Sequence, residues 1–429
     1  MSYKSLLMNR NYRLLLLGQS FSAGGSALSS LGILWYAAVN VGSPSLAGLI
    51  GTAWGLPSVL SFVAGVVADQ TDRRQLMIRV DGLSAILMLV LAIAIYFQHP
   101  SPSLILISFI LLLSLLREFF ETASFAFLPS LVDKEEITPA NSLLNVTQQG
   151  LLALARVIGG GLLSVLGVVG LLLIDAISYF VSALTLIAIP HPQGHMAKER
   201  VISSVNVREA PFPQKKTGDI HARLYEQIAD IKAGFLQMWT TPLIRKVVPW
   251  ALPANAAYGA ILVLLPSWIS HKLNSDATLY GFMIGMGTGG FMIGAILAPF
   301  FAGRYQANWI MGYFTLLEAI ALFFFTLVNE PILAILLYTS MSLFDGLSSP
   351  IFFSLLQVQT SEEYLGRIFG GLMTLLALGQ PIGMFLGGIL AEYGGLFTVF
   401  VAGSILIGLA GLRFLFAQPL RARLPSQTM

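Results

Sequence analysis

The sequence has few charged residues and no cysteine. Asp, Glu, Lys and Arg make up 10% of its 429 residues, whereas a soluble globular domain carries roughly 25%. Without cysteine the chain forms neither a disulfide nor a thiolate metal site, and its five histidines are scattered. It also lacks a nucleophile–histidine constellation, a phosphate-binding loop and a basic block typical of nucleic-acid binding. These absences argue against an enzyme, a resident metal or cofactor, and a nucleic-acid partner.

Apolar residues are abundant and occur in long runs. They make up 56% of the chain, which has a mean hydropathy of +0.78. A membrane-spanning helix needs about 20 mainly apolar residues. The first run has no small-residue cleavage site after it, so we expect a retained span and not a signal peptide. The sequence predicts an all-α membrane protein with twelve spans, at 13–38, 45–69, 75–97, 102–128, 141–166, 170–190, 246–270, 279–302, 308–328, 331–356, 366–391 and 395–417.

A polar stretch from residue 191 to 245 interrupts this pattern. It is rich in Lys and Arg and contains Pro211 and Pro213. We interpret it as a cytoplasmic linker between a six-helix bundle at 1–190 and a second one at 246–429. Apolar residues recur at helical spacing between Asp219 and Trp239, which predicts an amphipathic helix on the membrane surface. Such a helix would brace the two halves.

The basic residues divide unequally between the two sides of the predicted bundle. Cytoplasmic loops carry an excess of Lys and Arg. One side has only Lys272 in its loops. We therefore expect a bacterial cytoplasmic (inner) membrane protein with both termini in the cytoplasm. The linker lies on the other side, together with Lys4, Arg10, Arg13, Arg73, Arg74, Lys134, Arg304, Arg367, Arg421 and Arg423.

The two halves resemble each other at corresponding positions. Residues 45–48 (SLAG) open the second span and residues 278–281 (TLYG) open the eighth. An acidic pair follows the fourth span, and another follows the tenth. Aligning these pairs places Glu118 opposite Asp345. Two parallel six-helix repeats are the layout of the major facilitator fold, in which substrate sits at the midplane between the halves.

The loop after the second span carries the clearest motif. Residues 65–74 (GVVADQTDRR) resemble the loop 2–3 signature of major facilitator transporters, with Gln70 and Asp72 as departures from it. The resemblance implies a cytoplasmic gate formed by Gly65, Asp69, Arg73 and Arg74. Glycine would allow close helix contact, the Asp would lie against a helix N-terminus, and the arginines would pair with acidic residues.

Other stretches resemble one branch of that family, the drug:proton antiporters that include macrolide-efflux proteins and the enterobactin exporter. They are residues 11–13, 18–20, 174–180, 356–367 and 380–383. The chain departs from this branch at residues 156–161 (RVIGGG), where many drug antiporters carry a Gly-Pro-x-x-Gly-Gly motif. The glycines still predict a close helix contact there.

Three charged residues, Arg117, Glu118 and Glu121, lie on one face of the fourth span. A charge at the bilayer centre costs at least about 2.5–3.5 kcal/mol, so this face should meet a cavity or another helix. In one interpretation Arg117 pairs with Glu121, and Glu118 pairs with Arg156. In the other, Glu118 or Glu121 binds and releases a proton. Two acids and one base leave one negative charge in excess, and desolvation opposes that charge.

Asp345 is the third candidate for proton coupling. It has no basic neighbour in sequence, so it either titrates, binds a cation or supports a helix contact as a hydrogen-bonded acid. Three more acids, Asp81, Asp175 and Glu318, fall on spans that do not line the cavity in the family. We expect these three to be packing or surface groups.

The resemblance implies a central cavity lined by the first, fourth, seventh and tenth spans. Its candidate residues here are Gln19, Arg117, Asn255, Tyr258 and Phe344. An apolar pocket with few polar anchors suits amphipathic ligands.

The sequence therefore predicts a secondary active exporter of amphipathic small molecules of the drug, macrolide or siderophore class. It would exchange them for protons by alternating access. One six-plus-six chain closes a complete cavity, so we expect a monomer in the lipid bilayer. An uptake carrier or a lipid flippase on the same fold remains open as an alternative. A membrane enzyme or receptor is disfavoured.

Overall fold

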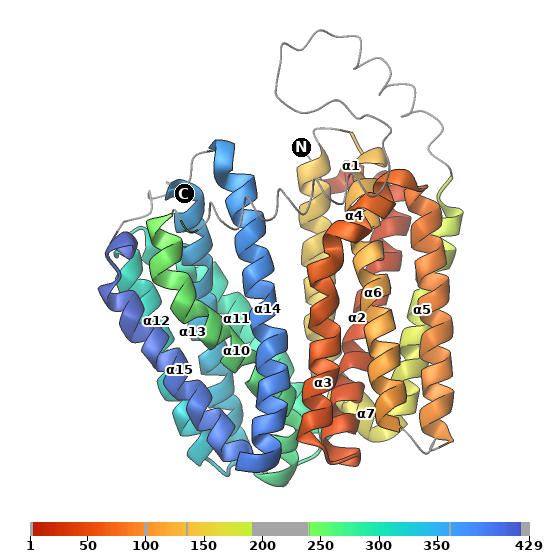
Figure 1. Ribbon diagram of the computed structural model, residues 1–429. Helices are drawn as coiled ribbons and strands as arrows, with labels where there is room; N and C mark the ends of the chain where they lie inside the picture. Colours follow the sequence, from red (N-terminus) through yellow and green to blue (C-terminus); the bar gives the residue numbers. More distant parts are fainter. Residues whose placement is uncertain are drawn as a thin grey trace.

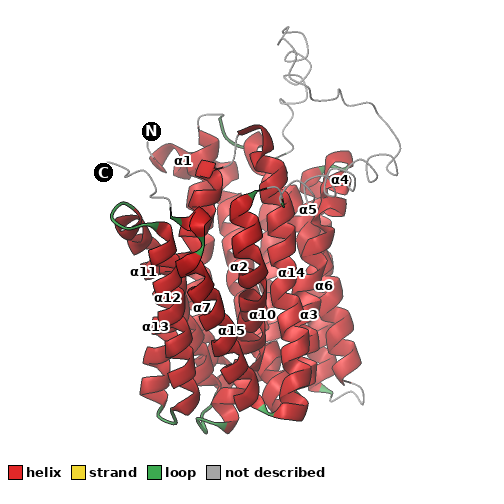
Figure 2. Cartoon of the chain, turned by 60° about the vertical axis from the view of Figure 1, so that its left-hand side comes forward, coloured by secondary structure: helices red, strands yellow, loops and turns green. Residues whose placement is uncertain are grey.

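The computed structural model describes residues 3–97, 102–133, 136–190, 239, 241–359 and 362–421. Within these residues the secondary structure is helical, with no strand (Figure 2). The helices run roughly parallel to one another across the whole molecule. The predicted all-α architecture is confirmed.

The helices fall into two groups, here called the N-half and the C-half. The N-half consists of α1 (Tyr3–Met8), α2 (Arg10–Trp35), the π-helix η1 (Tyr36–Asn40), α3 (Pro44–Gly55), the 3₁₀ turn η2 (Leu56–Leu60), α4 (Ser61–Gln70), α5 (Arg73–Tyr96), α6 (Pro102–Phe127), η3 (Leu128–Ser130) and α7 (Ile137–Ala188). The C-half consists of α10 (Pro242–His271), α11 (Ala277–Ala302), α12 (Ala307–Leu327), α13 (Pro331–Gln359), α14 (Glu362–Gly394), α15 (Leu396–Phe416) and η5 (Gln418–Leu420).

Three local features modify the predicted spans. The Asn9 side chain caps α2 by accepting hydrogen bonds from the backbone N–H groups of Asn11 and Tyr12, which separates α2 from the short α1. The predicted span 45–69 is not one continuous helix, because η2, which contains Pro57, separates α3 from α4. The predicted spans 141–166 and 170–190 appear as one long α7, in which Gly167 has φ 66° and ψ 177°. Glycine adopts this conformation without steric cost, so the chain reverses there.

Nine of the described helices are long and apolar enough to cross a membrane. One of them is α7, which contains two spans on either side of Gly167. The α3–α4 segment is not among the nine, since its two parts have 12 and 10 residues. With α2 and α3–α4 added, the described residues contain the twelve predicted spans.

The two halves approach each other at one end of the molecule and lie apart toward the other (Figure 1). At the end where they meet, α3 packs on α14 and α7 packs on α11. We call these two contacts the seams. Hydrogen bonds cross them: Ser45 donates from its N–H and its hydroxyl to Glu392 Oε2 at 3.2 and 2.9 Å. The hydroxyls of Ser164 and Thr278 are 3.0 Å apart.

Glycines allow the helix backbones to touch at both seams. A Cβ added at Gly160 would overlap the carbonyl oxygen of Ala277, and one at Gly281 would overlap the backbone of Gly160. At the other seam, a Cβ at Gly48 would lie 2.5 Å from the carbonyl oxygen of Met384. Gly48 and Gly281 are the aligned glycines of the two sequence repeats. The close helix contact predicted for residues 156–161 is therefore present, and it joins the two halves.

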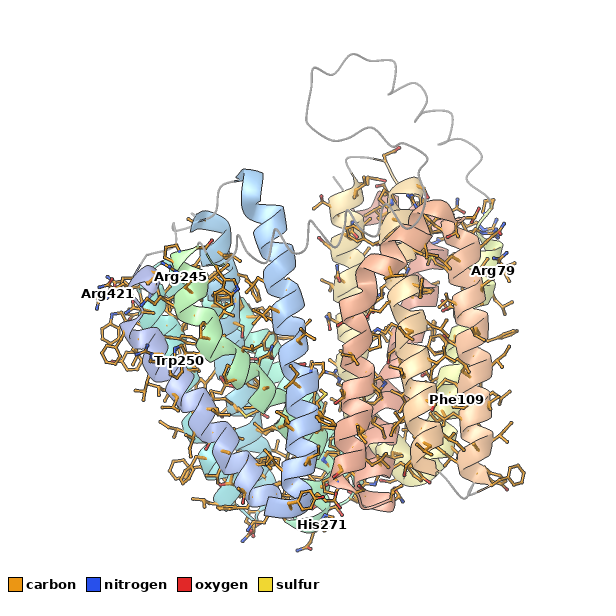
Figure 3. The ribbon with its side chains drawn as sticks, in the orientation of Figure 1. Arg79, Phe109, Arg245, Trp250, His271 and Arg421 are labelled. Atoms are coloured by element: carbon orange, nitrogen blue, oxygen red, sulfur yellow. The ribbon has the colours of Figure 1, made fainter. Side chains whose placement is uncertain are left out.

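The first and last described elements, α1 and η5, lie at the open end of the molecule (Figures 1 and 2). Arg245 and Arg421 lie at that end, whereas His271, which precedes Lys272, lies at the seam end (Figure 3). The predicted linker 191–245 and its amphipathic helix fall outside the described residues up to residue 238. Residues 242–245, the last of the predicted linker, belong instead to α10, which begins at Pro242.

Candidate functional site

The charged residues of α6 form a short ion pair. Arg117 Nε lies 2.6 Å from Glu121 Oε1, one helical turn away. The two side chains are 70% and 54% exposed, and Arg117 interacts electrostatically with Tyr179 of α7. The influence of Tyr179 shows that α7 lies near this face of α6, and the orientation of the face toward a cavity stays a prediction.

Glu118 does not pair with Arg156, which was its expected partner if the charges of this helix only stabilise the structure. Arg156 donates instead to the hydroxyl of Thr288 at 3.0 Å, across the seam between α7 and α11. Glu118 forms no ion pair with any residue that the structure describes. The predicted Arg117–Glu121 pair is thus confirmed, and the predicted Glu118–Arg156 pair is wrong. The reason is tertiary: the seam brings a hydroxyl of the other half within reach of Arg156.

In the C-half, acidic side chains meet hydroxyl donors from neighbouring turns and helices. Tyr258 of α10 donates a short hydrogen bond to Glu318 Oε1 of α12. Asp345 of α13 accepts a short hydrogen bond from Ser349, one turn later on the same helix. Asp345 interacts electrostatically with both Glu318 and Tyr258. Two of the predicted site residues, Tyr258 and Asp345, therefore interact with Glu318, an acid that was not among the predicted site residues.

The other predicted cavity residues have local partners. Asn255 is partly exposed and donates to the Leu376 carbonyl of α14 at 2.9 Å. Phe344 stacks on Phe314 of α12, with ring centroids 6.1 Å apart. Each of these two contacts holds two helices of the C-half together.

Gln19 lies inside the N-half. It is 6% exposed. Its amide donates a short hydrogen bond to Ser124 of α6, and its carbonyl accepts one from Gln148 of α7 at 3.1 Å. Gln19 thus joins three helices and does not line open space in this conformation. This differs from the prediction, because α6 and α7 both offer polar partners that sequence position alone does not reveal.

The three acids expected to be packing or surface groups are all buried. Asp81, Asp175 and Glu318 are 1%, 0% and 0% exposed, so the surface alternative is wrong for each. Asp175 accepts hydrogen bonds from Ser29 at 2.5 Å, Ser178 at 3.1 Å and Ser26 at 3.3 Å. The sequence contained one signal for this cluster. Ser26 and Ser29 are three residues apart, as are Asp175 and Ser178, so each pair lies on one side of its helix.

Gly65, the first residue of the gate motif, has space for a larger side chain. Among the described side chains, a Cβ added at Gly65 would meet the Thr122 methyl group alone, at 4.0 Å, which is an ordinary contact. The described residues therefore show no close helix approach at Gly65 of the kind that the motif predicted. Asp69 lies in α4, and its side chain is outside the described residues.

The two arginines of the motif donate to helix C-termini. Arg73 Nη1 lies 2.9 Å from the Ala126 carbonyl of α6. Arg74 Nε and Nη2 lie 2.9 and 2.8 Å from the Leu186 and Ile187 carbonyls of α7. The final carbonyls of a helix have no partner within it and attract cations. For Arg74 this corrects the expected pairing with an acidic residue.

Replacing Arg74 by glutamine should destabilise the folded protein. Two charge-assisted hydrogen bonds to α7 are lost, which is expected to cost about 1–2 kcal/mol. Thermal unfolding of the purified protein in detergent measures this. Arg79→Gln is the matched control, because Arg79 lies exposed on the same helix (Figure 3). Equal melting temperatures for the two variants would contradict the assignment.

The described residues contain no group of three or more His, Cys, Asp or Glu side chains that could hold a metal ion. The chemistry available to the site is therefore that of an acid–base pair, isolated carboxyl groups, hydroxyls and aromatic rings within a membrane. Such groups bind and release protons and contact amphipathic molecules.

Comparisons with known proteins match the whole length of the chain. A family model described as Major Facilitator Superfamily matches residues 15–370 and, in a second match, 251–428. The chain is 26% identical over 332 residues to the enterobactin exporter EntS of Shigella flexneri, covering 76% of this chain and 72% of that protein. It is 25% identical over 421 residues to the multidrug efflux pump Tap of Mycolicibacterium fortuitum, covering 95% and 96%. A solved bacterial homologue of the human lysosomal transporter Spinster has a TM-score of 0.69 and 13% identity, covering 96% and 98%.

Proposed function

The chain belongs to the Major Facilitator Superfamily, and on this basis we propose that it is a secondary active exporter that exchanges amphipathic small molecules for protons. The observation that carries the proposal is the charged face of α6. Arg117 and Glu121 form an ion pair with accessible side chains, and Glu118 beside them forms no ion pair with a described residue, although the Arg117 charge acts on both acids. Unpaired charge inside a membrane is costly and marks ion pathways and proton relays.

The direction of transport is supported by the relatives. One is an exporter and another is an efflux pump, and both have sequence similarity over most of this chain. A substrate of the drug, macrolide or siderophore class suits a space with aromatic and apolar walls and few charges, offered here by Phe344, Tyr258 and Asn255. Glu118, Glu121 and Asp345 are the proposed proton-coupling groups, and Arg117 is the fourth charged residue of the proposed cavity.

The orientation follows from the distribution of basic residues. Loops rich in Lys and Arg face the cytoplasm, and Arg245 and Arg421 lie at the end where the halves separate (Figure 3). The molecule is then an inner-membrane monomer that is open to the cytoplasm and closed at its seams toward the outside. Gly65, Asp69, Arg73 and Arg74 would form the cytoplasmic gate after the halves rock. Residues 1–190 and 246–429 would move as the two units, with 191–245 linking them.

An uptake carrier or lipid flippase is the alternative. It would use the same cavity, but would run inward or without protons. Imposed pH gradients of either sign in reconstituted vesicles separate these functions from export.

Efflux of ethidium, a fluorescent lipophilic cation, from cells tests the proposal. Wild type should export ethidium, and a protonophore should abolish export. Glu118→Gln, Glu121→Gln and Asp345→Asn each remove one titrating group while keeping its shape. We expect at least one of the three to reduce export by about tenfold or more, because proton linkage of this kind is typically worth 5- to 150-fold.

Efflux that continues unchanged in the presence of the protonophore would contradict proton coupling. Absence of efflux from wild-type cells would argue against export of this substrate class, and an uptake or lipid-flipping assay would then be the next measurement.

A further inference from the structure

Glu318 lies in the interior of the C-half with one carboxyl oxygen unused. It is 0% exposed on α12. Its Oε1 accepts the hydrogen bond from the Tyr258 hydroxyl, whereas its Oε2 is buried without any hydrogen-bond partner among the described residues. Buried polar atoms are nearly always satisfied, so an orphaned carboxyl oxygen calls for an explanation. A proton carried on Oε2 supplies one, because it removes the charge that a partner would otherwise have to balance.

The helices around Glu318 bring no positive charge to it. From α13 the facing group is Asp345, and from α10 it is the Tyr258 hydroxyl. α15 packs on α12 through Gly408, next to Ala319, and through Gly411, next to Leu316. The only charged residue of α15 is Arg413, and its guanidinium lies over the Trp250 ring, 4.9 Å from the centroid.

The remaining neighbours of α12 are also uncharged. The sequences of α11 and η5 contain no Asp, Glu, Lys, Arg or His. The other ionisable residue of α13, Tyr338, interacts with Arg156. Glu318 and Asp345 therefore form a pair of carboxyl groups that the described side chains leave without a cation. Two acids that repel each other in a dry site do not both ionise readily, so one of them binds a proton more easily than an isolated carboxyl group would.

The two acids differ in access. Asp345 is partly exposed, and it lies on α13, the counterpart of α6 in the sequence repeat. Glu318 is enclosed. On this difference in exposure, we expect a proton to reach Asp345 before Glu318. Tyr258, which is also partly exposed, donates its hydroxyl to the enclosed acid.

We propose that Glu318 is a proton-binding residue of the transport cycle, which takes a proton on Oε2 and exchanges it with Asp345 while Oε1 stays bonded to Tyr258. This inference rests on the proposed proton-coupled export. It assigns the acid on α12 a function in place of the packing function expected from its sequence position. Release of the proton leaves a carboxylate whose remaining donor is the Tyr258 hydroxyl, so the α10–α12 contact responds to the protonation of Glu318.

Ethidium transport by the full-length protein in liposomes tests this inference, using two modes. The first is uphill transport driven by an imposed pH gradient. The second is ethidium exchange at equal pH on both sides, which needs no net proton movement. Glu318→Gln keeps the size and the hydrogen-bond acceptor of the side chain but cannot release a proton. It should abolish the gradient-driven mode, a loss of roughly tenfold or more, and retain exchange. Glu330→Gln, in the exposed loop before α13, is the matched control and should behave as wild type.

The outcomes are distinct. If wild type responds to the gradient and Glu318→Gln responds equally, Glu318 is only a packing group and the inference is wrong. If wild type itself ignores the gradient, the proposed proton coupling fails and the inference fails with it. If Glu318→Gln does not reach the membrane, Tyr258→Phe decides. Loss of the hydroxyl should shift the pH dependence of gradient-driven transport, and an unchanged pH profile would overturn the inference.

Discussion

A disulfide between cysteines introduced at positions 164 and 278 is expected to stop transport completely, and a reductant should restore it. The hydroxyls of Ser164 on α7 and Thr278 on α11 lie 3.0 Å apart across a seam. A disulfide spans a Cα separation of about 4.4–6.8 Å, and hydroxyls that touch across the seam show that the two side chains point toward each other. The double variant Ser164→Cys/Thr278→Cys would join the two halves covalently at the end that must open.

The absence of native cysteine makes this experiment direct, since no background thiol has to be removed. Each single variant, Ser164→Cys and Thr278→Cys, serves as a control and should transport with or without oxidant. Ethidium export is measured before oxidation, after oxidation and after reduction. Full transport by protein that mass spectrometry shows to be cross-linked would mean that these two helices do not separate during the cycle.

The second large effect is expected from Gly160→Val. A Cβ at Gly160 meets the Ala277 carbonyl oxygen and the Thr278 backbone, which cannot rotate out of its way. Overpacking of this kind typically costs 1–3 kcal/mol. That cost would shift the balance between closed and open seams by roughly 5- to 150-fold. We expect export to fall accordingly, and the seam end to become accessible to a membrane-impermeant thiol reagent in the Ser164→Cys background.

Gly161→Val is the matched control for this variant. Gly161 is the next residue of the same helix, and a Cβ there has no heavy atom within 4 Å. Both changes place the same β-branched residue in a helix, so their intrinsic helix propensities cancel. Equal loss of export in the two variants would show that the effect comes from α7 itself and not from its contact with α11.

The sequence was most informative where local chemistry decides the structure. Long apolar runs predicted the spans because a bilayer leaves backbone groups no partner outside the helix. The Arg117–Glu121 pair was predictable because residues four apart face each other on one helix. It was least informative for contacts between helices. The Glu118–Arg156 pair was wrong because Thr288 of the other half lies within reach of Arg156.

The acidic residues also divide into those that the sequence could identify and one that only the tertiary structure revealed. Sequence spacing identified Glu118, Glu121 and Asp345 as charges inside a membrane, and each lies within a helix as expected. It could not separate Glu318 from an ordinary packing residue. That distinction depends on the burial of Oε2, on the Tyr258 hydroxyl of another helix, and on the charge of Asp345 on a third helix.

By itself, the sequence determined that this protein is a helical membrane protein with two repeated halves, because hydropathy and loop charge act within each segment along the chain. Only the tertiary structure decided which end is closed, which glycines let the halves touch and which carboxyl groups lack a partner. Those properties arise where helices distant in sequence meet, since a side chain's partners and its access to water are set by the neighbouring helix and not by its own.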